Sequence, residues 1–483
     1  MSIKGKAIKG GIWTLGQILF ERAVQAIVFI IIAKRLGALG FGQAAIAIAP
    51  AVILGAGIQA ANQVLIRLHA RDTTYTDAAY AACIIIASLM SLIIIGGAAL
   101  ASKLAGAPQI GLMMAATAVV PLFYGAGCVS EAVLFSRMQF SSLALRRSVA
   151  VAIAGLACVA VASTNYAVWA LPVQLIINSF TASTISLSLA RVPFTNIPRK
   201  GSVGEMVRLL FPAIGTALLG QVGLRSVDVA LGGLASVAAA GVYRMARTVL
   251  DLATSLFFNP ISNVLVPVLS ASASERTKLE QSVRRILSLT VGMMAIVFVS
   301  ACAFFTVATP LLLPKDFIHL TMAGLILSPT IMSTAVIGVC HSTLIATERS
   351  HVSLRISAGA TCLAVFSAVG LAHLGLEWVC AGLSISSWTV AGFYLWSVGK
   401  FFKTTFILSS QELRVCATAA VLGPGIYLFA APNGLRIDPA NLTSFAEPIA
   451  VSALVIILQA GVVVLLIGKN VVALFRRRAL YAP

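Results

Sequence analysis

The sequence predicts an all-α integral membrane protein with about 14 transmembrane helices. Of its 483 residues, 59% are hydrophobic and only 10% are charged, whereas a soluble domain carries about a quarter charged residues. Apolar runs of about eighteen residues or more recur along the chain, and each is long enough to cross a hydrocarbon core as a helix. These runs are too long and too uniformly apolar for the alternating strands of a membrane barrel, so we expect no strands.

The runs give the helices in order. Six lie in the first half of the chain, at 11–33, 42–66, 78–101, 110–135, 148–166 and 168–190. Six more lie in the second half, at 209–231, 242–268, 286–309, 318–344, 357–374 and 376–398, and a further pair follows at 414–431 and 448–468. The short runs 148–166 and 357–374 are the weakest as separate helices, which leaves twelve helices as the alternative.

The helices divide into two six-helix pseudo-repeat lobes. We predict an N-terminal lobe at 1–190, a cytoplasmic linker at 191–208, a C-terminal lobe at 209–398, and an extra helix pair with a basic cytoplasmic tail at 399–483. Polar residues recur about 200 positions apart, and so do the turns Leu36–Gly42 and Leu234–Gly241. An even number of helices per repeat gives both lobes the same orientation in the membrane. Chance coincidence of polar residues is the alternative explanation.

The net charge of +19 is a signal of membrane topology. Of the 34 Lys and Arg, 25 fall on the ends and loops of one side if both termini are cytoplasmic, 5 fall on the other side, and 4 lie inside predicted helices. This bias orients the protein with both termini in the cytoplasm of a bacterial inner membrane. The basic residues therefore face anionic lipid head groups, and we expect no nucleic-acid partner.

Eight charged residues lie inside the predicted helices: Arg22, Arg225, Arg244, Arg247, Glu21, Glu131, Asp228 and Asp251. Each costs roughly 2.5–3.5 kcal/mol at the bilayer centre, so we expect them to line an interior that holds water or ligand. Arginine donates a planar fork of hydrogen bonds to phosphate. The four arginines are therefore candidates for binding a diphosphate in a shared cavity. The structural alternative is neutralisation within one helix, because Arg225 and Asp228 are spaced i,i+3 and Arg247 and Asp251 are spaced i,i+4.

Polar residues on the same helices are candidates for sugar contacts or for lining the cavity: Gln17, Gln25, Gln59, Asn62, Gln221 and Asn259. The carboxylates Glu21, Asp228 and Asp251 are candidates for carrying a coupling proton or Na⁺. We expect no catalytic residues, no metal and no cofactor, because no Walker loop, nucleophile elbow or HExxH motif occurs. The eight cysteines are scattered singly through apolar segments, as small hydrophobic residues are.

Several segments resemble the bacterial polysaccharide-transport family, the lipid-linked oligosaccharide flippases of the superfamily that also holds multidrug exporters and the lipid II flippase. They are Gly10–Thr14, Ala33–Gly42, Glu131–Arg147, Tyr166–Leu171, Leu224–Asp228 and Gly241–Tyr243. Family members usually carry a proline and an acidic residue in the first turn, where this chain has Ala38 and Leu39.

The resemblance implies a flippase that moves an undecaprenyl-diphosphate-linked oligosaccharide from the cytoplasmic to the periplasmic leaflet by alternating access. By helix position only, it also implies that Arg22 and either Arg244 or Arg247 meet the lipid diphosphate. The implied partners are the lipid-linked oligosaccharide, membrane lipids, and polymerase or glycosyltransferases of the same pathway, and we expect a monomer. Alternatives are a lipid II flippase, a cation-coupled drug or metabolite exporter, and a non-transport component of polysaccharide assembly.

Overall fold

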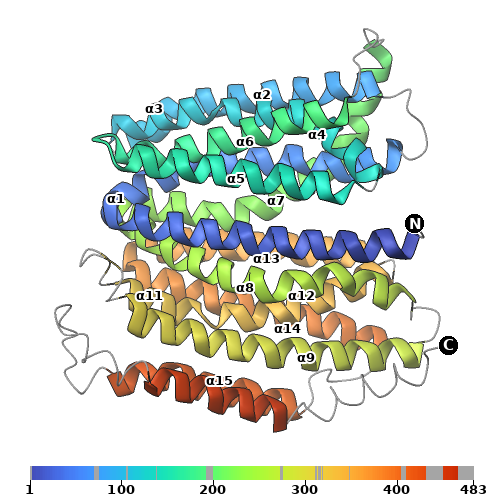
Figure 1. The fold of residues 1–483 in the computed structure, drawn as a ribbon. Helices are drawn as coiled ribbons and strands as arrows, with labels where there is room; N and C mark the ends of the chain where they lie inside the picture. The colour runs from blue at the N-terminus through green and yellow to red at the C-terminus, as the bar shows by residue number, and fades with distance from the viewer. Residues whose placement is uncertain are drawn as a thin grey trace. The chain divides into compact units, whose positions relative to one another are not determined.

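The computed structural model is built from helices throughout the residues that it describes, with no strand among them (Figure 1). These residues are 3–69, 76–104, 107–137, 139–191, 200–271, 276–309, 313, 317, 319–347, 349–403, 410–430 and 450–465. Residues 192–199 of the predicted linker, the loop before the last helix and the basic tail lie outside them, and residues 200–208 of the predicted linker belong to a helix. The all-α prediction is confirmed.

The helices of the first half follow the predicted order. They are α1 (Ile3–His69), α2 (Thr76–Leu104), α3 (Pro108–Thr117), α4 (Val119–Ser136), α5 (Phe140–Ala162), the short η1 (Ala167–Trp169), α6 (Ala170–Ala190) and α7 (Lys200–Leu234). The first two predicted runs form the single assigned helix α1, which is interrupted by non-helical geometry at Gly37, with φ 63° and ψ −177°. A positive φ is available to glycine without steric cost, so the predicted turn becomes a kink.

The helices of the second half complete the fold. They are α8 (Val237–Ala271), α9 (Arg276–Ala303), η2 (Phe304–Ala308), α11 (Leu320–Leu327), α12 (Thr330–Ala346), α13 (Ser350–Leu371), η4 (Ala372–Leu374), α14 (Leu376–Phe402) and α15 (Ser410–Ala430). A shorter apolar helix spans Ala450–Leu465. A helix therefore coincides with every predicted run. The two weakest runs are separate helices, α5 and α13, each ending at a short turn.

Ten helical segments of the described residues are long and apolar enough to cross a membrane. The first, Gly16–Ile66, covers two of the predicted runs because it includes the kink at Gly37. Helix α8 is not among the ten, and it carries Arg244, Arg247 and Asp251 within a little over two turns. Large apolar side chains point outward on several segments, among them Leu156, Phe211, Phe366 and Val421. This exposure suits a surface that faces lipid.

The chain forms two compact units, Met1–Gly241 (unit 1) and Val242–Pro483 (unit 2). These units are defined by which residues are in contact, whereas the predicted lobes are defined by the internal repeat. The two divisions are therefore different, and the predicted lobe boundaries stay a prediction. Local features do recur in the two halves. The pair α3 and α4 breaks at Ala118 as α11 and α12 break at Ser328. In each half a longer helix follows the pair, and a 3₁₀ turn precedes the next helix: η1 lies between α5 and α6, and η4 lies between α13 and α14.

Two glycines bring the repeated turns into backbone contact within unit 1. A Cβ on Gly42 would lie 1.9 Å from the carbonyl oxygen of Val237, and a Cβ on Gly241 would lie 2.0 Å from that of Ala38. The contacts are reciprocal, since 38 and 237, like 42 and 241, are 199 positions apart. This local symmetry between the turns supports an internal duplication.

Candidate functional site

The polar residues of the first helix pair with one another along one face of α1. The amide Nε2 of Gln17 donates to Oε1 of Glu21 at 2.8 Å, and Nη1 of Arg22 donates to Oε1 of Gln25 at 2.7 Å. Gln17 is buried, and Glu21, Arg22 and Gln25 are half-buried. The predicted stripe therefore exists as hydrogen-bonded neighbours, and it carries a carboxylate and a guanidinium side by side.

The arginine of α7 lies beside a deeply buried carboxylate. Nη1 of Arg225 is 3.9 Å from Oδ2 of Asp228, whose side chain is 1% exposed. Gln221, one turn earlier on the helix, is half-buried. The ion pair that the i,i+3 spacing allowed is thus formed, at a distance near the upper limit for such a pair.

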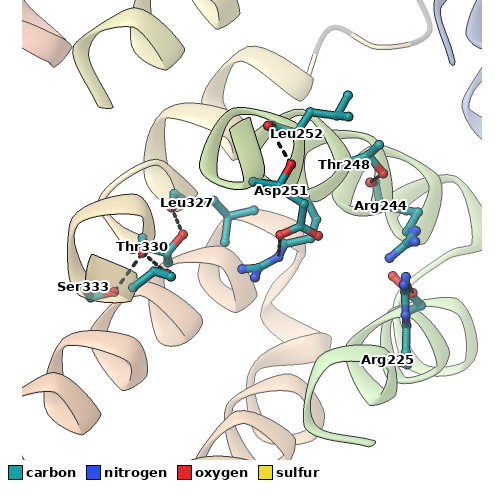
Figure 2. Close-up of polar contacts among 12 residues, drawn as sticks. Arg225, Arg244, Thr248, Asp251, Leu252, Leu327, Thr330 and Ser333 are labelled. Carbon is teal, nitrogen blue, oxygen red and sulfur yellow. Dashed lines mark hydrogen bonds and ion pairs between the residues drawn. The ribbon is translucent and has the colours of Figure 1, made fainter. Parts of the chain in front are cut away.

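The second half of the arginine set lies on α8 in unit 2. Nε of Arg247 is 3.0 Å from Oδ1 of Asp251, the i,i+4 ion pair that the sequence left open (Figure 2). Thr248 donates to the backbone carbonyl oxygen of Arg244 at 2.8 Å on the same helix. Arg244 and Arg247 are half-buried and Asp251 is exposed, so these groups are reachable by solvent or ligand.

Several polar atoms of the predicted set in unit 1 are buried without a hydrogen-bond partner among the described residues. Among them are Nε of Arg22, Nε of Arg225 and Oδ1 of Asn62. A buried donor or acceptor left unpaired costs about 1–3 kcal/mol, so water or ligand would stabilise each of them. Asn259 on α8 is half-buried. Convergence of all four arginines on one cavity stays a prediction.

Sequence reasoning missed a buried ion-pair cluster inside unit 1. Nη1 of Arg146 is 2.9 Å from Oε2 of Glu131 and donates to Oγ of Ser186 at 2.9 Å, while Nη2 of Arg147 is 3.8 Å from Oε1 of Glu131. Gln59 lines the same small pocket, together with Tyr124 and Ser183. The cluster ties α4, α5 and α6 together and gives one predicted cavity residue, Gln59, a charged neighbourhood.

The miss has a definite origin. The apolar run at 148–166 placed Arg146 and Arg147 in a loop, whereas α5 begins at Phe140 and contains both. Glu131 and Arg146 are opposite charges on either side of the short connection between α4 and α5. Their positions in the sequence could have predicted the ion pair, because helices joined by a short turn pack antiparallel and bring such residues side by side.

A second polar cluster lies at the corresponding place in unit 2. Nδ1 of His341 is 2.5 Å from Oγ of Ser353, and the hydroxyls of Ser353 and Ser357 each lie 3.0 Å from that of Tyr394. It joins α12, α13 and α14 as the first cluster joins α4, α5 and α6. No group of three metal-ligating side chains that could hold an ion occurs within the described part of the chain.

Comparisons with known proteins fit this architecture. A family model described as polysaccharide biosynthesis protein matches residues 31–320. No curated protein matches the chain significantly. Among solved structures, the chain is similar to the lipid II flippase MurJ in an inward closed conformation, with 15% identity, a TM-score of 0.73, and 95% of this chain and 99% of that chain covered.

Two further solved structures extend the likeness. An inward-facing multidrug resistance MATE family transporter of the MOP superfamily has 15% identity and a TM-score of 0.60, over 80% of this chain and 96% of that one. A MOP superfamily transporter from Pyrococcus furiosus has 16% identity and a TM-score of 0.50, over 82% and 97%. At these identities the likeness shows the fold, and the fold is that of these transporters.

Proposed function

The chain belongs to the polysaccharide biosynthesis protein family, and from this premise we propose that it is a flippase for a lipid-linked oligosaccharide. The substrate is a glycan carried on undecaprenyl diphosphate, and transport by alternating access takes it from the cytoplasmic to the periplasmic leaflet of a bacterial inner membrane. The protein acts as a secondary transporter and not as an enzyme. Polymerase and glycosyltransferases of the same pathway are its expected partners.

The observation that carries the proposal is the set of arginines on α1, α7 and α8. Arg22 and Arg225 each have a buried Nε with no hydrogen-bond partner among the residues that the structure describes, and Arg247 is half-buried beside an exposed carboxylate. A diphosphate offers several anionic oxygens to such groups, and charge-assisted hydrogen bonds are about twice as strong as neutral ones. Gln17, Gln25, Gln59, Asn62, Gln221 and Asn259 are the polar residues that we assign to the sugars.

Coupling to an ion gradient is part of the proposal. Glu21, Asp228 and Asp251 each lie beside a positive or amide group on their own helix, so a proton or Na⁺ could compete for the carboxylate. Transport that continues unchanged after both gradients are collapsed would remove these residues as drivers.

The test is complementation of a strain that lacks its own oligosaccharide flippase. Arg22→Ala and Arg247→Ala should each lower polysaccharide export at least tenfold at equal protein level, because each loses a charge-assisted bond worth about 1.5–3 kcal/mol. Arg→Lys should restore part of the activity, since the ammonium lacks the bidentate fork. Arg35→Ala is the matched control, as Arg35 is exposed on the same helix. Full export by both alanine variants would refute the diphosphate role.

Transport of lipid II is a second candidate, favoured by the likeness to the lipid II flippase over 95% of this chain. Both substrates present a lipid diphosphate, so the arginines do not separate them. A strain depleted of its lipid II flippase separates them directly. Growth rescue there, without rescue of polysaccharide export in the first strain, would favour the second candidate.

A further inference from the structure

Three helix ends of unit 2 place cationic side chains around aromatic rings. The guanidinium carbon Cζ of Arg276 lies 5.3 Å from the ring centroid of Phe401, and that of Arg349 lies 4.8 Å from the same centroid. The Arg276 guanidinium also donates to the backbone carbonyl oxygen of Phe401. Nζ of Lys400 lies 5.4 Å from the ring of Trp396. We name Arg276, Arg349, Trp396, Lys400 and Phe401 the Phe401 cluster.

The ring contacts leave the positive charges of the Phe401 cluster in place, and no ion pair with a carboxylate of the described residues neutralises them. All three cationic side chains are exposed. The nearest described carboxylate in sequence, Glu280, lies 2.9 Å from Arg284. Basic residues of these helix ends outnumber acidic ones: they are Arg276, Lys278, Arg349, Arg355, Lys400 and Lys403, against Glu275, Glu280 and Glu348. The local potential is therefore positive.

Two helix N-termini add to that potential. Helix α9, of 28 residues, begins at Arg276, and α13, of 22 residues, begins directly after Arg349. No side-chain cap bonds to the first N–H groups of α13. The N-terminal end of a helix carries a partial positive charge and free N–H donors, which favour an anion.

The Phe401 cluster lies where a membrane surface would be. It sits at the ends of two candidate membrane spans, Arg276–Ala308 and Leu376–Phe402. Trp396, one turn before Lys400, is 64% exposed, and exposed tryptophans concentrate at the boundary between hydrocarbon and head groups. Lysine reaches the head-group region from such a position while its stem stays in the apolar layer.

We propose that the Phe401 cluster is a binding site for the phosphate of an anionic phospholipid head group. The ring of Phe401 orders two guanidiniums before the lipid arrives, which reduces the entropy lost on binding. Trp396 packs beside the upper acyl chain, and Lys400 provides a third positive charge. The site is distinct from the arginines assigned to transport and does not depend on the transported substrate.

The experiment measures how much phosphatidylglycerol the purified full-length chain retains, by native mass spectrometry, after exchange from nanodiscs of phosphatidylglycerol and phosphatidylethanolamine. Arg276→Gln with Arg349→Gln should weaken phosphatidylglycerol retention about tenfold or more, since each basic residue at the surface contributes about 1 kcal/mol. The matched control is Arg191→Gln with Arg208→Gln, which removes the same charge from exposed arginines of unit 1. An equal loss in both double variants would overturn the proposal, because net charge alone would then explain the binding.

Phe401→Leu tests the geometry without changing the charge. It keeps an apolar side chain but removes the ring, so retention should fall severalfold while phosphatidylethanolamine binding is unchanged. Retention equal to that of the original protein would overturn the proposal. Each variant is compared only at an unchanged melting temperature, and Arg349→Gln alone, in the exposed turn, replaces the double variant if the latter fails to fold.

Discussion

At the scale of residues, two ion pairs differ in what their loss costs. The Glu131–Arg146 pair is buried, with side chains 12% and 8% exposed, whereas the Glu280–Arg284 pair is 26% and 38% exposed. Breaking a buried pair leaves an uncompensated charge and costs about 3–5 kcal/mol. A surface pair contributes about 0–1 kcal/mol.

Glu131→Gln or Arg146→Met should therefore lower the apparent melting temperature in detergent by several degrees, and Glu280→Gln should leave it nearly unchanged. The double variant Glu131→Leu with Arg146→Met should recover much of the loss, because it removes both buried charges together. Arg147 also loses its carboxylate partner, but its side chain is 47% exposed and stays in contact with solvent. Additive losses in the double variant would show that the pair is not the source of the effect.

Sequence spacing predicted the contacts within a helix and missed those between helices. The pairs Arg225–Asp228 and Arg247–Asp251 follow from i,i+3 and i,i+4 spacing alone. Predicting the Glu131–Arg146 pair requires knowing how α4 and α5 are connected and that α5 begins at Phe140. Hydropathy places the start of that helix eight residues later. Whether the arginines hold a diphosphate is a question about ligand contacts, and it stays a prediction.

At the scale of elements, hydropathy located every helix because bilayer-crossing runs must satisfy their own backbone hydrogen bonds. It did not separate a turn from a kink, since Gly37 changes direction within a continuous apolar sequence. The breaks between α3 and α4 and between α11 and α12 were likewise invisible to it. Such features depend on backbone conformation and on close packing.

The close approach of the repeated turns at Gly42 gives a prediction at this scale. Gly42→Ala places a methyl group 1.9 Å from the backbone oxygen of Val237, which has no side-chain freedom with which to move away. We expect a destabilisation of about 1–3 kcal/mol, as for other overpacked contacts, measured as a lower melting temperature. Gly96→Ala on α2 is the control, because nothing lies within 4 Å of its Cβ. An unchanged Gly42→Ala protein would mean that the contact is not close in solution.

At the scale of the whole molecule, basic residues from different helix ends lie near one another, in agreement with their predicted position on one side of the membrane. Arg276, Arg349 and Lys400 come from three separate helix ends of unit 2, and two of them meet at one ring. In unit 1, Arg137 after α4 donates to the backbone oxygen of Ala190 at the end of α6 at 3.2 Å. In each unit, helix ends that the positive-inside count assigned to one side of the membrane therefore lie close together.

That arrangement predicts the orientation, with both termini and both basic ends in the cytoplasm. When a reporter is fused after residue 138, between α4 and α5, or after residue 348, between α12 and α13, a fluorescent protein should fluoresce and alkaline phosphatase should be inactive, because both fusion points would be cytoplasmic. When a reporter is fused after residue 164 or 374, in the turns following α5 and α13, alkaline phosphatase should be active and a fluorescent protein should be dark, because both fusion points would be periplasmic. The reason is that Lys and Arg near helix ends resist translocation, and the turns around residues 164 and 374 carry no Lys or Arg. Phosphatase activity at 138 and 348 would reverse the orientation, and with it the direction in which the proposed flippase would load its substrate.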